Sequence, residues 1–277
     1  MHPSNLLVVI PARYGSSRLP GKPLKMLGNQ TLIQRTFATA QAAKMLLPPQ
    51  LQKKVDIVVA TDDQRIMDHL NDHKIPVEIT SKACRNGTER LIACYRKLNR
   101  TGGALNLQGD APLIPPKLIA ELIHLLLAET EEIQTILTSA HTLTWSALDQ
   151  LRTHKQDSPF SGTCVTSSST SQALWFSKNI IPAIRHEDTL RTQSTLSPVL
   201  KHLGIYGFKD HAIKKLESLP ISHYESIEEL EQLRWIEAGM HIYLHKTKLK
   251  SATESLGIDS PKDLKIAQQW LLQESSF

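Results

Sequence analysis

LLVVIPARYGSSRLPGKPL, residues 6–24, is the stretch of sequence that decides the fold. Its first seven residues, 6–12, form a branched apolar run that is typical of a buried strand. A loop with two glycines follows, and a helical spacing of apolar residues over 32–45 comes next, until Pro48 stops it. A strand that passes through such a loop into a helix is the first part of a βαβ unit. Open sheets built from these units bind phosphates beyond the carboxyl ends of their strands.

Short apolar strands and helical patterns keep alternating along the rest of the chain, which predicts an α/β protein. We expect strands at 55–60, 75–79, 104–107, 133–139, 173–177, 203–208 and 240–245. Helix starts are predicted at Asp63, at Asn86, at Pro115, at a capping box of Ser226 and Glu229 whose helix ends at Gly239, and at a second box of Ser260 and Asp263. The exception is 153–172, where ten of twenty residues are Ser or Thr. Here we predict a mobile or inserted loop, with a polar edge hairpin as the alternative.

The positive charge of the chain is concentrated at its N-terminal end. The 277 residues hold 32 Lys and Arg against 27 Asp and Glu, yet no acid precedes Asp56, and eight basic side chains lie in the first 55 residues. The remainder is slightly acidic, which argues against a general nucleic-acid-binding surface. A hydrophobic fraction of 40% can form a core, and no apolar run reaches the ~20 residues that span a bilayer. Three cysteines without a CxxC pair favour neither a disulfide framework nor a zinc site, and they fit a reducing cytoplasm.

Three cations in the loop after the first strand suggest a binding site for a triphosphate. Arg13, Arg18 and Lys22 have glycines between them and no nearby acid in the sequence. Arginine can bind phosphate oxygens in a bidentate fork, while lysine acts as a point charge. The glycine spacing matches neither the dinucleotide fingerprint nor a Walker A loop. The alternative is an ordinary solvated basic loop.

Two acids and one polar strand complete the candidate chemistry. Asp110 ends an apolar strand, and Asp259 follows a short apolar run just before a helix start. Magnesium is commonly held by one or two carboxylates together with substrate phosphates, so these acids could form a metal site that faces the basic loop. The alternative for Asp259 is a residue of the helix cap. In the segment 201–208, which contains the strand predicted at 203–208, His202 and Tyr206 share one face if no bulge intervenes. The alternative is an ordinary half-buried strand.

Taken together, these segments resemble the 3-deoxy-manno-octulosonate (Kdo) cytidylyltransferases, also called CMP-Kdo synthetases. The matching segments are IPARYGSSRLPGKPL from Ile10, VVATDDQRI from Val58, NGTERL from Asn86, LNLQGDAPLIP from Leu105, ALWFSKNIIP from Ala173, KHLGIYGF from Lys201, EELEQLRWIEAG from Glu228 and LGIDSPKDL from Leu256. Sialic-acid cytidylyltransferases are similar at the first loop but differ in its continuation. The resemblance implies a three-layer Rossmann-like fold with a mixed, mostly parallel sheet and a smaller antiparallel subdomain.

The resemblance also implies the reaction and its residues. The anomeric hydroxyl of Kdo, or of a close analogue such as 8-amino-Kdo, attacks the α-phosphate of CTP, which yields the CMP-sugar for lipopolysaccharide biosynthesis and pyrophosphate. Lys22, Arg13 and Asp110 are the implied catalytic residues, and Mg²⁺ bound by Asp110 and Asp259 is the implied cofactor. The implied nucleotide contacts are Pro11, Ala12, Arg13, Arg18, Lys22, Ala60, Thr61, Gly87, Thr88 and Gln108. The implied sugar contacts are Arg185, His202, Tyr206, Glu231 and Gln232.

The remaining implications concern the organisation of the chain. We expect one nucleotidyltransferase domain over 1–277, with a nucleotide-binding core at 1–140, a sugar-binding and dimerisation part at 141–255 and a returning metal-site segment at 256–277. A cytoplasmic homodimer without a membrane span or a nucleic-acid partner is expected. Three departures from the family pattern are Ala111 in place of an acid, the segment around Arg185, and the Ser/Thr-rich stretch. The rival from another class is a non-catalytic nucleotide-binding relative.

Overall fold

The structure is a computed structural model that describes residues 6–16, 18–128 and 133–274. The described chain divides into two compact units. The first unit contains the described residues up to 128 together with 205–213 and 250–274, and the second contains 133–204 and 214–249. The segment that carries Asp259 thus belongs to the same unit as the basic loop. No helix among the described residues is both long enough and apolar enough to cross a membrane.

The first unit is built on a parallel sheet. Its strands are β1 (Leu6–Ala12), β4 (Val55–Thr61), β5 (Val77–Ile79) and β6 (Ala104–Asn106), together with the last residues of β10 (Leu196–Phe208). β1 pairs in parallel with both β4 and β6, β4 pairs in parallel with β5, and the end of β10 runs antiparallel to β6. The side chains of β1 are almost wholly buried, as expected for a central strand covered on both faces.

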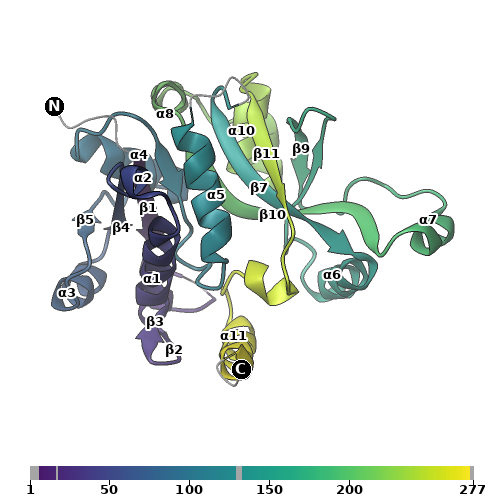
Figure 1. The fold of residues 1–277 in the computed structure, drawn as a ribbon, viewed down its shortest axis with the longest axis horizontal. Helices are drawn as coiled ribbons and strands as arrows, with labels where there is room; N and C mark the ends of the chain where they lie inside the picture. The colour runs from purple at the N-terminus through teal and green to yellow at the C-terminus, as the bar shows by residue number, and fades with distance from the viewer. Residues whose placement is uncertain (1–5, 17, 129–132, 275–277) are drawn as a thin grey trace. The chain divides into compact units, whose positions relative to one another are not determined.

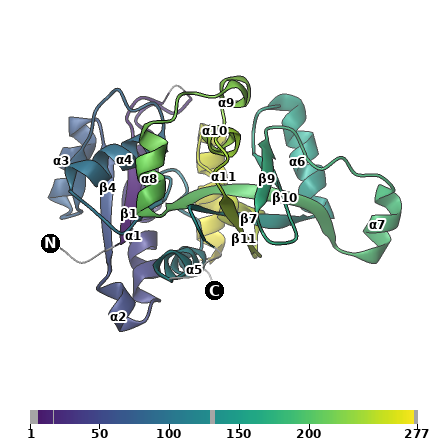
Figure 2. The same cartoon turned by 90° about the horizontal axis from the view of Figure 1, so that it is seen from above.

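Helices cover both faces of this sheet, which gives the three-layer arrangement. α1 (Leu32–Met45) and α5 (Pro116–Leu127) pack beside each other on one face, and α4 (Gly87–Lys97) packs on the other (Figure 2). The other helices and strands of the unit are the hairpin of β2 (Met26–Leu27) and β3 (Gln30–Thr31), α2 (Pro49–Gln52), α3 (Gln64–Asp72) and α11 (Pro261–Glu274) (Figure 1). Two 3₁₀ turns, η1 (Lys22–Leu24) and η2 (Ala252–Ser255), complete it. The chain passes between the units within α8 (Asp210–Glu217).

The second unit contains the more antiparallel part of the fold. Its strands are β7 (Ile136–Thr144), β8 (Cys164–Ser167), β9 (Ala173–Ser177), the first part of β10, and β11 (Ile242–Thr247). β11 pairs in parallel with β7, whereas β8 pairs antiparallel with both β9 and β10. Its helices are α6 (Trp145–Asp157), α7 (Glu187–Gln193), α9 (His223–Glu228) and α10 (Glu231–Glu237). One apolar cluster of this unit contains Trp145, Leu148 and Val199.

The predicted α/β class with a mixed, mostly parallel sheet and a smaller antiparallel part is confirmed. Each of the seven predicted strands overlaps a strand of the structure, and helices begin after Asp63, Asn86 and Ser260 as predicted. The prediction of one domain with three sub-regions stays a prediction.

Two local predictions are wrong. The Ser/Thr-rich stretch 153–172 is not a single mobile or inserted loop, because it contains the end of α6 and the whole of β8. The alternative, a polar hairpin, is closer to the structure, since β8 pairs antiparallel with β9, the next strand along the chain. Lys155 organises the connection by donating hydrogen bonds to the carbonyl oxygens of Ser161, Gly162 and Lys178. The helix predicted from Ser226 to Gly239 is two helices, since Glu229 adopts a left-handed backbone with φ of 52° that ends α9.

Candidate active site

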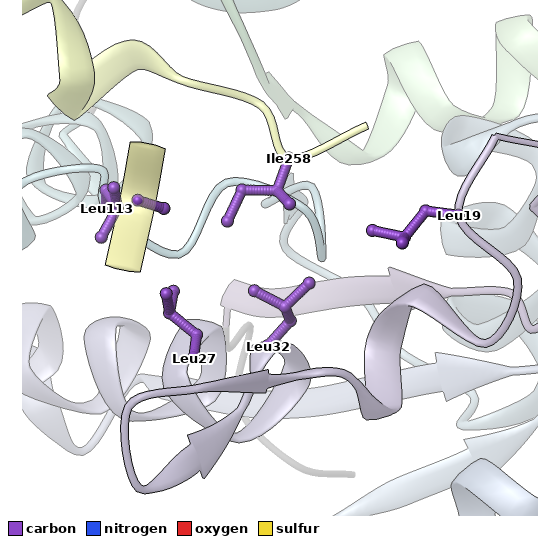
Figure 3. Close-up of a cluster of buried hydrophobic side chains, with 6 residues drawn as sticks. Leu19, Leu27, Leu32, Leu113 and Ile258 are labelled. Atoms are coloured by element: carbon purple, nitrogen blue, oxygen red, sulfur yellow. The ribbon is translucent and has the colours of Figure 1, made fainter. Parts of the chain in front are cut away.

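An apolar cluster brings together the three segments that carry the predicted catalytic and metal-binding residues. Leu19, Leu113 and Ile258 are buried in one group with Leu27 and Leu32 (Figure 3). Each of the first three lies within a few residues of a charged candidate, namely Arg18 and Lys22, Asp110, and Asp259. Burial of each of these leucine and isoleucine side chains stabilises the folded protein by about 1.5–3 kcal/mol. The packing therefore holds three distant segments at one place.

Backbone hydrogen bonds fix the returning segment more closely. The amide of Ile258 donates to the carbonyl oxygen of Asp110 at 2.8 Å. The next helix begins at a reciprocal cap, in which the carboxylate of Asp263 accepts from the amide and hydroxyl of Ser260, at 2.8 and 2.7 Å, and from the amide of Asp259. The side chain of Asp259 therefore does not serve as the helix cap, and its carboxylate faces the basic loop instead.

The ammonium group of Lys22 lies between the two carboxylates. Its Nζ is 2.7 Å from Oδ2 of Asp110 and 2.9 Å from Oδ1 of Asp259. The Lys22 side chain is 15% exposed, against 31% for Asp110 and 41% for Asp259, so the cluster opens toward solvent on the side of the acids. Arg18, whose side chain is 69% exposed, adds a longer contact of 3.3 Å to the other oxygen of Asp259.

The electrostatics of this cluster favour a bound cation. Burial alone would lower the pKa of Lys22, but the attraction of Asp110 and Asp259 and the hydrogen bonds to both outweigh it and raise the pKa above its ordinary value. Two carboxylates that stabilise one positive charge in this way are hard oxygen donors of the kind that Mg²⁺ takes. Their remaining coordination positions would be filled by substrate oxygens and water, because the described residues contain no cluster of three metal-ligating side chains.

The predicted nucleotide-binding residues of β1 and β4 lie at the carboxyl ends of these strands. Pro11 is in register with Ala60, and Ala12 with Thr61. Thr61 is fully buried, and its hydroxyl accepts from the amide of Asp63 at 3.3 Å, which shapes the turn into α3. Ala12, Ala60 and Thr61 are buried, and Pro11 is partly exposed. The predicted contacts of these strand ends with a nucleotide stay a prediction.

Gly87 and Gln108 extend this surface. A Cβ added to Gly87 would lie 3.0 Å from the side-chain amide of Gln108 and 3.2 Å from the ring of Pro11, so these three predicted residues converge on one point. Gly109 approaches β1 still more closely, because a Cβ there would lie 2.6 Å from the carbonyl oxygen of Pro11. Behind them, the side-chain amide of the buried Asn106 reaches the hydroxyl of Thr88 at 3.4 Å.

Arg13 is the predicted cation that the structure does not join to this group. Its side chain is exposed and has no ion pair to any described residue, whereas Lys22 and Arg18 both contact Asp259. An exposed guanidinium at the mouth of the loop is free to contact a triphosphate. Its predicted role stays a prediction.

The sequence reasoning missed a buried ion pair beside the nucleotide-binding residues. The guanidinium of Arg90 donates to Asp62 at 2.8 Å and to the hydroxyl of Thr80 at 2.7 Å, and its side chain is only 4% exposed. Thr80 in turn donates to the carbonyl oxygen of Thr61 at 3.0 Å. Arg90 thus ties α4 to the ends of β4 and β5. The available signal was its place beside Gly87 and Thr88 in NGTERL.

The predicted sugar contacts lie mostly in the second unit. His202 is buried, hydrogen-bonds the hydroxyl of Thr138 at 2.8 Å and stands edge-on to Phe176. Its pKa is lowered to about 3, because burial disfavours the imidazolium and Lys178 repels it. Gly204 adopts a φ of 71°, so the regular alternation that would place His202 and Tyr206 on one face is interrupted between them.

The other predicted sugar contacts occupy separate elements. Glu231 and Gln232 are the first residues of α10, and Gln232 is 2% exposed. Arg185 is exposed in the connection before α7. Tyr206 belongs to the first unit, where its ring stacks on that of Phe208. The roles of all these residues in sugar binding stay predictions.

Comparison with known proteins gives one consistent result. The family model described as cytidylyltransferase matches residues 7–242. The 3-deoxy-manno-octulosonate cytidylyltransferase of Maricaulis maris is 36% identical over 260 residues, which cover 94% of each chain. An 8-amino-3,8-dideoxy-manno-octulosonate cytidylyltransferase of a Shewanella species is 35% identical over 96% of this chain and 98% of its own.

A solved structure extends the match to the fold. The CMP:2-keto-3-deoxy-manno-octonic acid synthetase in complex with CTP aligns with a TM-score of 0.80. The alignment covers 98% of this chain and 100% of that one, at 29% sequence identity.

Proposed function

Because the chain belongs to the 3-deoxy-manno-octulosonate cytidylyltransferase family, we propose that it transfers the cytidylyl group of CTP to Kdo for lipopolysaccharide biosynthesis. The observation that carries the proposal is the cluster of Lys22, Asp110 and Asp259 beside the carboxyl ends of β1, β4 and β6. In a parallel sheet this is where nucleotide phosphates bind. The cytosine and ribose would contact the surface formed by Pro11, Gly87 and Gln108.

The reaction needs one new bond and one broken bond. The oxygen of the anomeric hydroxyl of the sugar acid bonds to the α-phosphorus, the bond from that phosphorus to the bridging oxygen breaks, and pyrophosphate leaves. The hydroxyl proton is lost to solvent or to a phosphate oxygen. Negative charge builds up on the phosphoryl oxygens, so the fixed charge of Lys22, with Arg13 and Arg18 on the outer phosphates, lowers the barrier.

Asp110 and Asp259 would hold the divalent cation, for which we propose Mg²⁺. When bound, the ion supplies charge neutralisation at the phosphates and lowers the pKa of a hydroxyl bound to it. The departure at Ala111 does not remove either carboxylate. What the chain itself contributes is the placement of both acids, through the apolar cluster and the hydrogen bond between Ile258 and Asp110.

The substrate has a second candidate, because a relative named for 8-amino-Kdo is as similar to this chain as several named for Kdo. 8-amino-Kdo differs from Kdo by an amine in place of the hydroxyl at the end of the carbon chain of the sugar. We propose that His202, Glu231, Gln232, Tyr206 and Arg185 contact the sugar acid, with Arg185 on its carboxylate. An acid among these contacts would also suit the amine of 8-amino-Kdo.

Release of pyrophosphate tests the proposal. Purified protein would be assayed with each of the four nucleoside triphosphates and with Kdo, 8-amino-Kdo and sialic acid, in the presence of Mg²⁺. We expect turnover with CTP and an octulosonate and none with sialic acid. Binding of CTP without turnover on any sugar acid would instead identify a non-catalytic nucleotide-binding relative.

We further propose that the protein is a cytoplasmic homodimer. The support is a set of exposed apolar side chains in the second unit, among them Leu174, Tyr224 and Ile227, which are 50%, 45% and 63% exposed. Light scattering after size exclusion should give twice the mass of one chain, which is 31.0 kDa. Ile227→Asp should shift the measured mass from that of the dimer toward that of a single chain. A wild-type monomer at micromolar concentration would refute the proposed assembly.

A further inference from the structure

Lys22 has two tasks that it cannot perform at the same time. In the proposed reaction its ammonium faces the triphosphate, yet in the structure the same ammonium lies between Asp110 and Asp259, at 2.7 and 2.9 Å. The position between two carboxylates is also where these acids would bind a divalent cation. The ammonium and the metal ion are therefore competitors for the same pair of oxygen donors.

We propose that Lys22 is an internal counter-cation, which occupies the carboxylate pair until a triphosphate draws it away and so makes tight binding of the divalent cation depend on nucleotide. The inference rests on the proposed function, because it assigns the phosphates of CTP as the second partner of Lys22. In the metal-free protein the ammonium offsets part of the negative charge of two acids that would otherwise repel each other. When the nucleotide arrives, its phosphates offer the ammonium an equivalent set of charge-assisted hydrogen bonds.

Lys22 carries this role rather than its neighbours in the basic loop. It contacts both acids and its side chain is 15% exposed, so its charge is poorly screened. Arg18 contacts only Asp259, at 3.3 Å, and its side chain is 69% exposed, so that its ion pair contributes little. Lys25, three residues further on, is exposed and carries the same charge. It offers a matched control for a simple change of net charge.

The carboxylate pair is held in place independently of Lys22. Asp110 and Asp259 lie on segments joined by the hydrogen bond from the Ile258 amide to the Asp110 carbonyl, and Ile258 is fully buried in the apolar cluster. Removing the ammonium should leave the acids close together, with the exposed Arg18 still in contact with Asp259. Such a pair binds a divalent cation more tightly than one that already holds the ammonium, so the exchange is a competition between cations at a preformed site.

Binding of Mn²⁺, measured by electron paramagnetic resonance without nucleotide or sugar, tests the inference directly. Lys22→Met keeps most of the side-chain length and removes its charge, and Lys25→Met is the control. We expect Lys22→Met to bind Mn²⁺ about tenfold or more tightly than wild type, a ratio in the range of ordinary coupling between sites. Lys25→Met should match wild type, and Lys22→Met/Asp110→Asn should lose the gain. Circular dichroism and thermal unfolding establish that each variant is folded.

The coupling between nucleotide and Mn²⁺ supplies a second arm of the test. A non-hydrolysable analogue of CTP should raise the Mn²⁺ affinity of the wild-type protein, and by reciprocity Mn²⁺ should raise the affinity of the analogue by the same factor. The factor by which the analogue raises Mn²⁺ affinity should be much smaller in Lys22→Met, because this variant has no ammonium to displace from the carboxylates. Lys22→Gln repeats the test if Lys22→Met does not fold.

Equal or weaker Mn²⁺ binding by folded Lys22→Met would overturn the inference, as would a gain that survives Asp110→Asn. Failure of the proposed function would look different, because it would appear as the absence of pyrophosphate release with any sugar acid. The nucleotide-free comparison depends only on Lys22, Asp110 and Asp259, so the two results can be told apart.

Discussion

The half-buried ammonium of Lys22 is the group around which the charged residues of the site are arranged. Asp110 and Asp259 contact it directly, and each acid is fixed by its own backbone, the first by the turn that follows β6 and the second by the cap of α11. The two carboxylates stabilise either the ammonium of Lys22 or a metal ion at this position. The site therefore suits an exchange between ammonium and metal during nucleotide binding.

Replacing Asp110 by Asn tests the metal role of one acid. The amide has nearly the same shape and is neutral, so we expect turnover at ordinary Mg²⁺ concentrations to fall at least about a hundredfold, in line with loss of one electrostatic group at a phosphoryl centre. The thermal unfolding midpoint should change little, because the side chain is 31% exposed. Rates would be measured by pyrophosphate release.

Asp72→Asn is the matched control, since Asp72 is an exposed acid at the end of α3. It should retain wild-type rates. An Asp110→Asn protein with wild-type kcat and wild-type Mg²⁺ dependence would remove this acid from the site.

Single residues of this site could be predicted from sequence, but their contacts could not. Lys22, Asp110 and Asp259 stand out because they follow predicted strands or lie in a glycine-containing loop, where open α/β sheets bind their ligands. Their mutual contact depends on packing between segments up to 237 positions apart, which no local pattern encodes. Arg90 was missed for a related reason, since a buried arginine inside a helical pattern looks like a solvated one until its partners are known.

At the scale of elements, the close approach of the turn after β6 to the end of β1 sets the position of Gln108 and Asp110. The carbonyl oxygen of Pro11 leaves no room for a side chain at Gly109. On the other side, the hydroxyl of Thr36 in α1 donates to the carbonyl oxygen of Gly109 at 3.2 Å. The turn is thus clamped between a strand and a helix.

Gly109→Ala should disturb this clamp. The added Cβ would lie 2.6 Å from a backbone oxygen that cannot rotate away, so the turn must shift and carry Asp110 with it. We expect kcat to fall by about a hundredfold, the size of effect that a displacement of ~1 Å can have on a positioned group. Pyrophosphate release at saturating CTP and sugar measures it.

Gly257→Ala is the control within the same site, because no atom lies within 4 Å of a Cβ built there. It should keep activity near wild type. If Gly109→Ala were equally active, the close approach of the turn to β1 would have no part in placing Asp110.

Elements were predictable where one pattern dominated a segment. The buried strand β1 and the capped start of α11 carry strong local signals, and both were predicted nearly to the residue. The Ser/Thr-rich stretch was predicted as a loop because its polar composition does not indicate a strand. β8 forms there because it pairs with β9 and β10, and these contacts are not visible in the local sequence. The break at Glu229 was missed because a left-handed backbone at a glutamate has no sequence signature.

At the scale of the whole molecule, the two units differ in the titratable groups that they bury. The second unit buries His141 and His202, whose pKa values are lowered to about 4 and about 3, mainly by desolvation of the imidazolium. Nε2 of His141 is buried without a hydrogen-bond partner among the described residues. Both histidines are thus neutral in the folded protein at pH values where a solvated histidine gains a proton.

Stability should therefore fall as the pH is lowered from 6.5 toward 5. The unfolded chain binds a proton at each histidine near its ordinary pKa of 6.5, whereas the folded chain does not until about pH 4 or 3. The contribution of each histidine to the free energy of unfolding is complete above pH 6.5. Below that pH it falls by up to about 1.4 kcal/mol per pH unit. Urea unfolding monitored across this range measures the slope.

His141→Phe separates this effect from other titrations, because phenylalanine fills the position without a titratable group. The variant should lose stability less steeply between pH 6.5 and 5 than wild type does. Identical slopes in both proteins would show that His141 is protonated equally well in the folded and unfolded chain.

The function proposed for the whole molecule is the formation of a CMP-sugar from CTP and an octulosonate. Phosphorus nuclear magnetic resonance of a reaction with CTP, Kdo and Mg²⁺ detects that product. We predict a new phosphodiester signal that grows in step with pyrophosphate and is absent with Asp110→Asn. Release of pyrophosphate without the phosphodiester, or no reaction with either octulosonate while CTP binds, would contradict the assignment of this chain as a sugar-activating cytidylyltransferase.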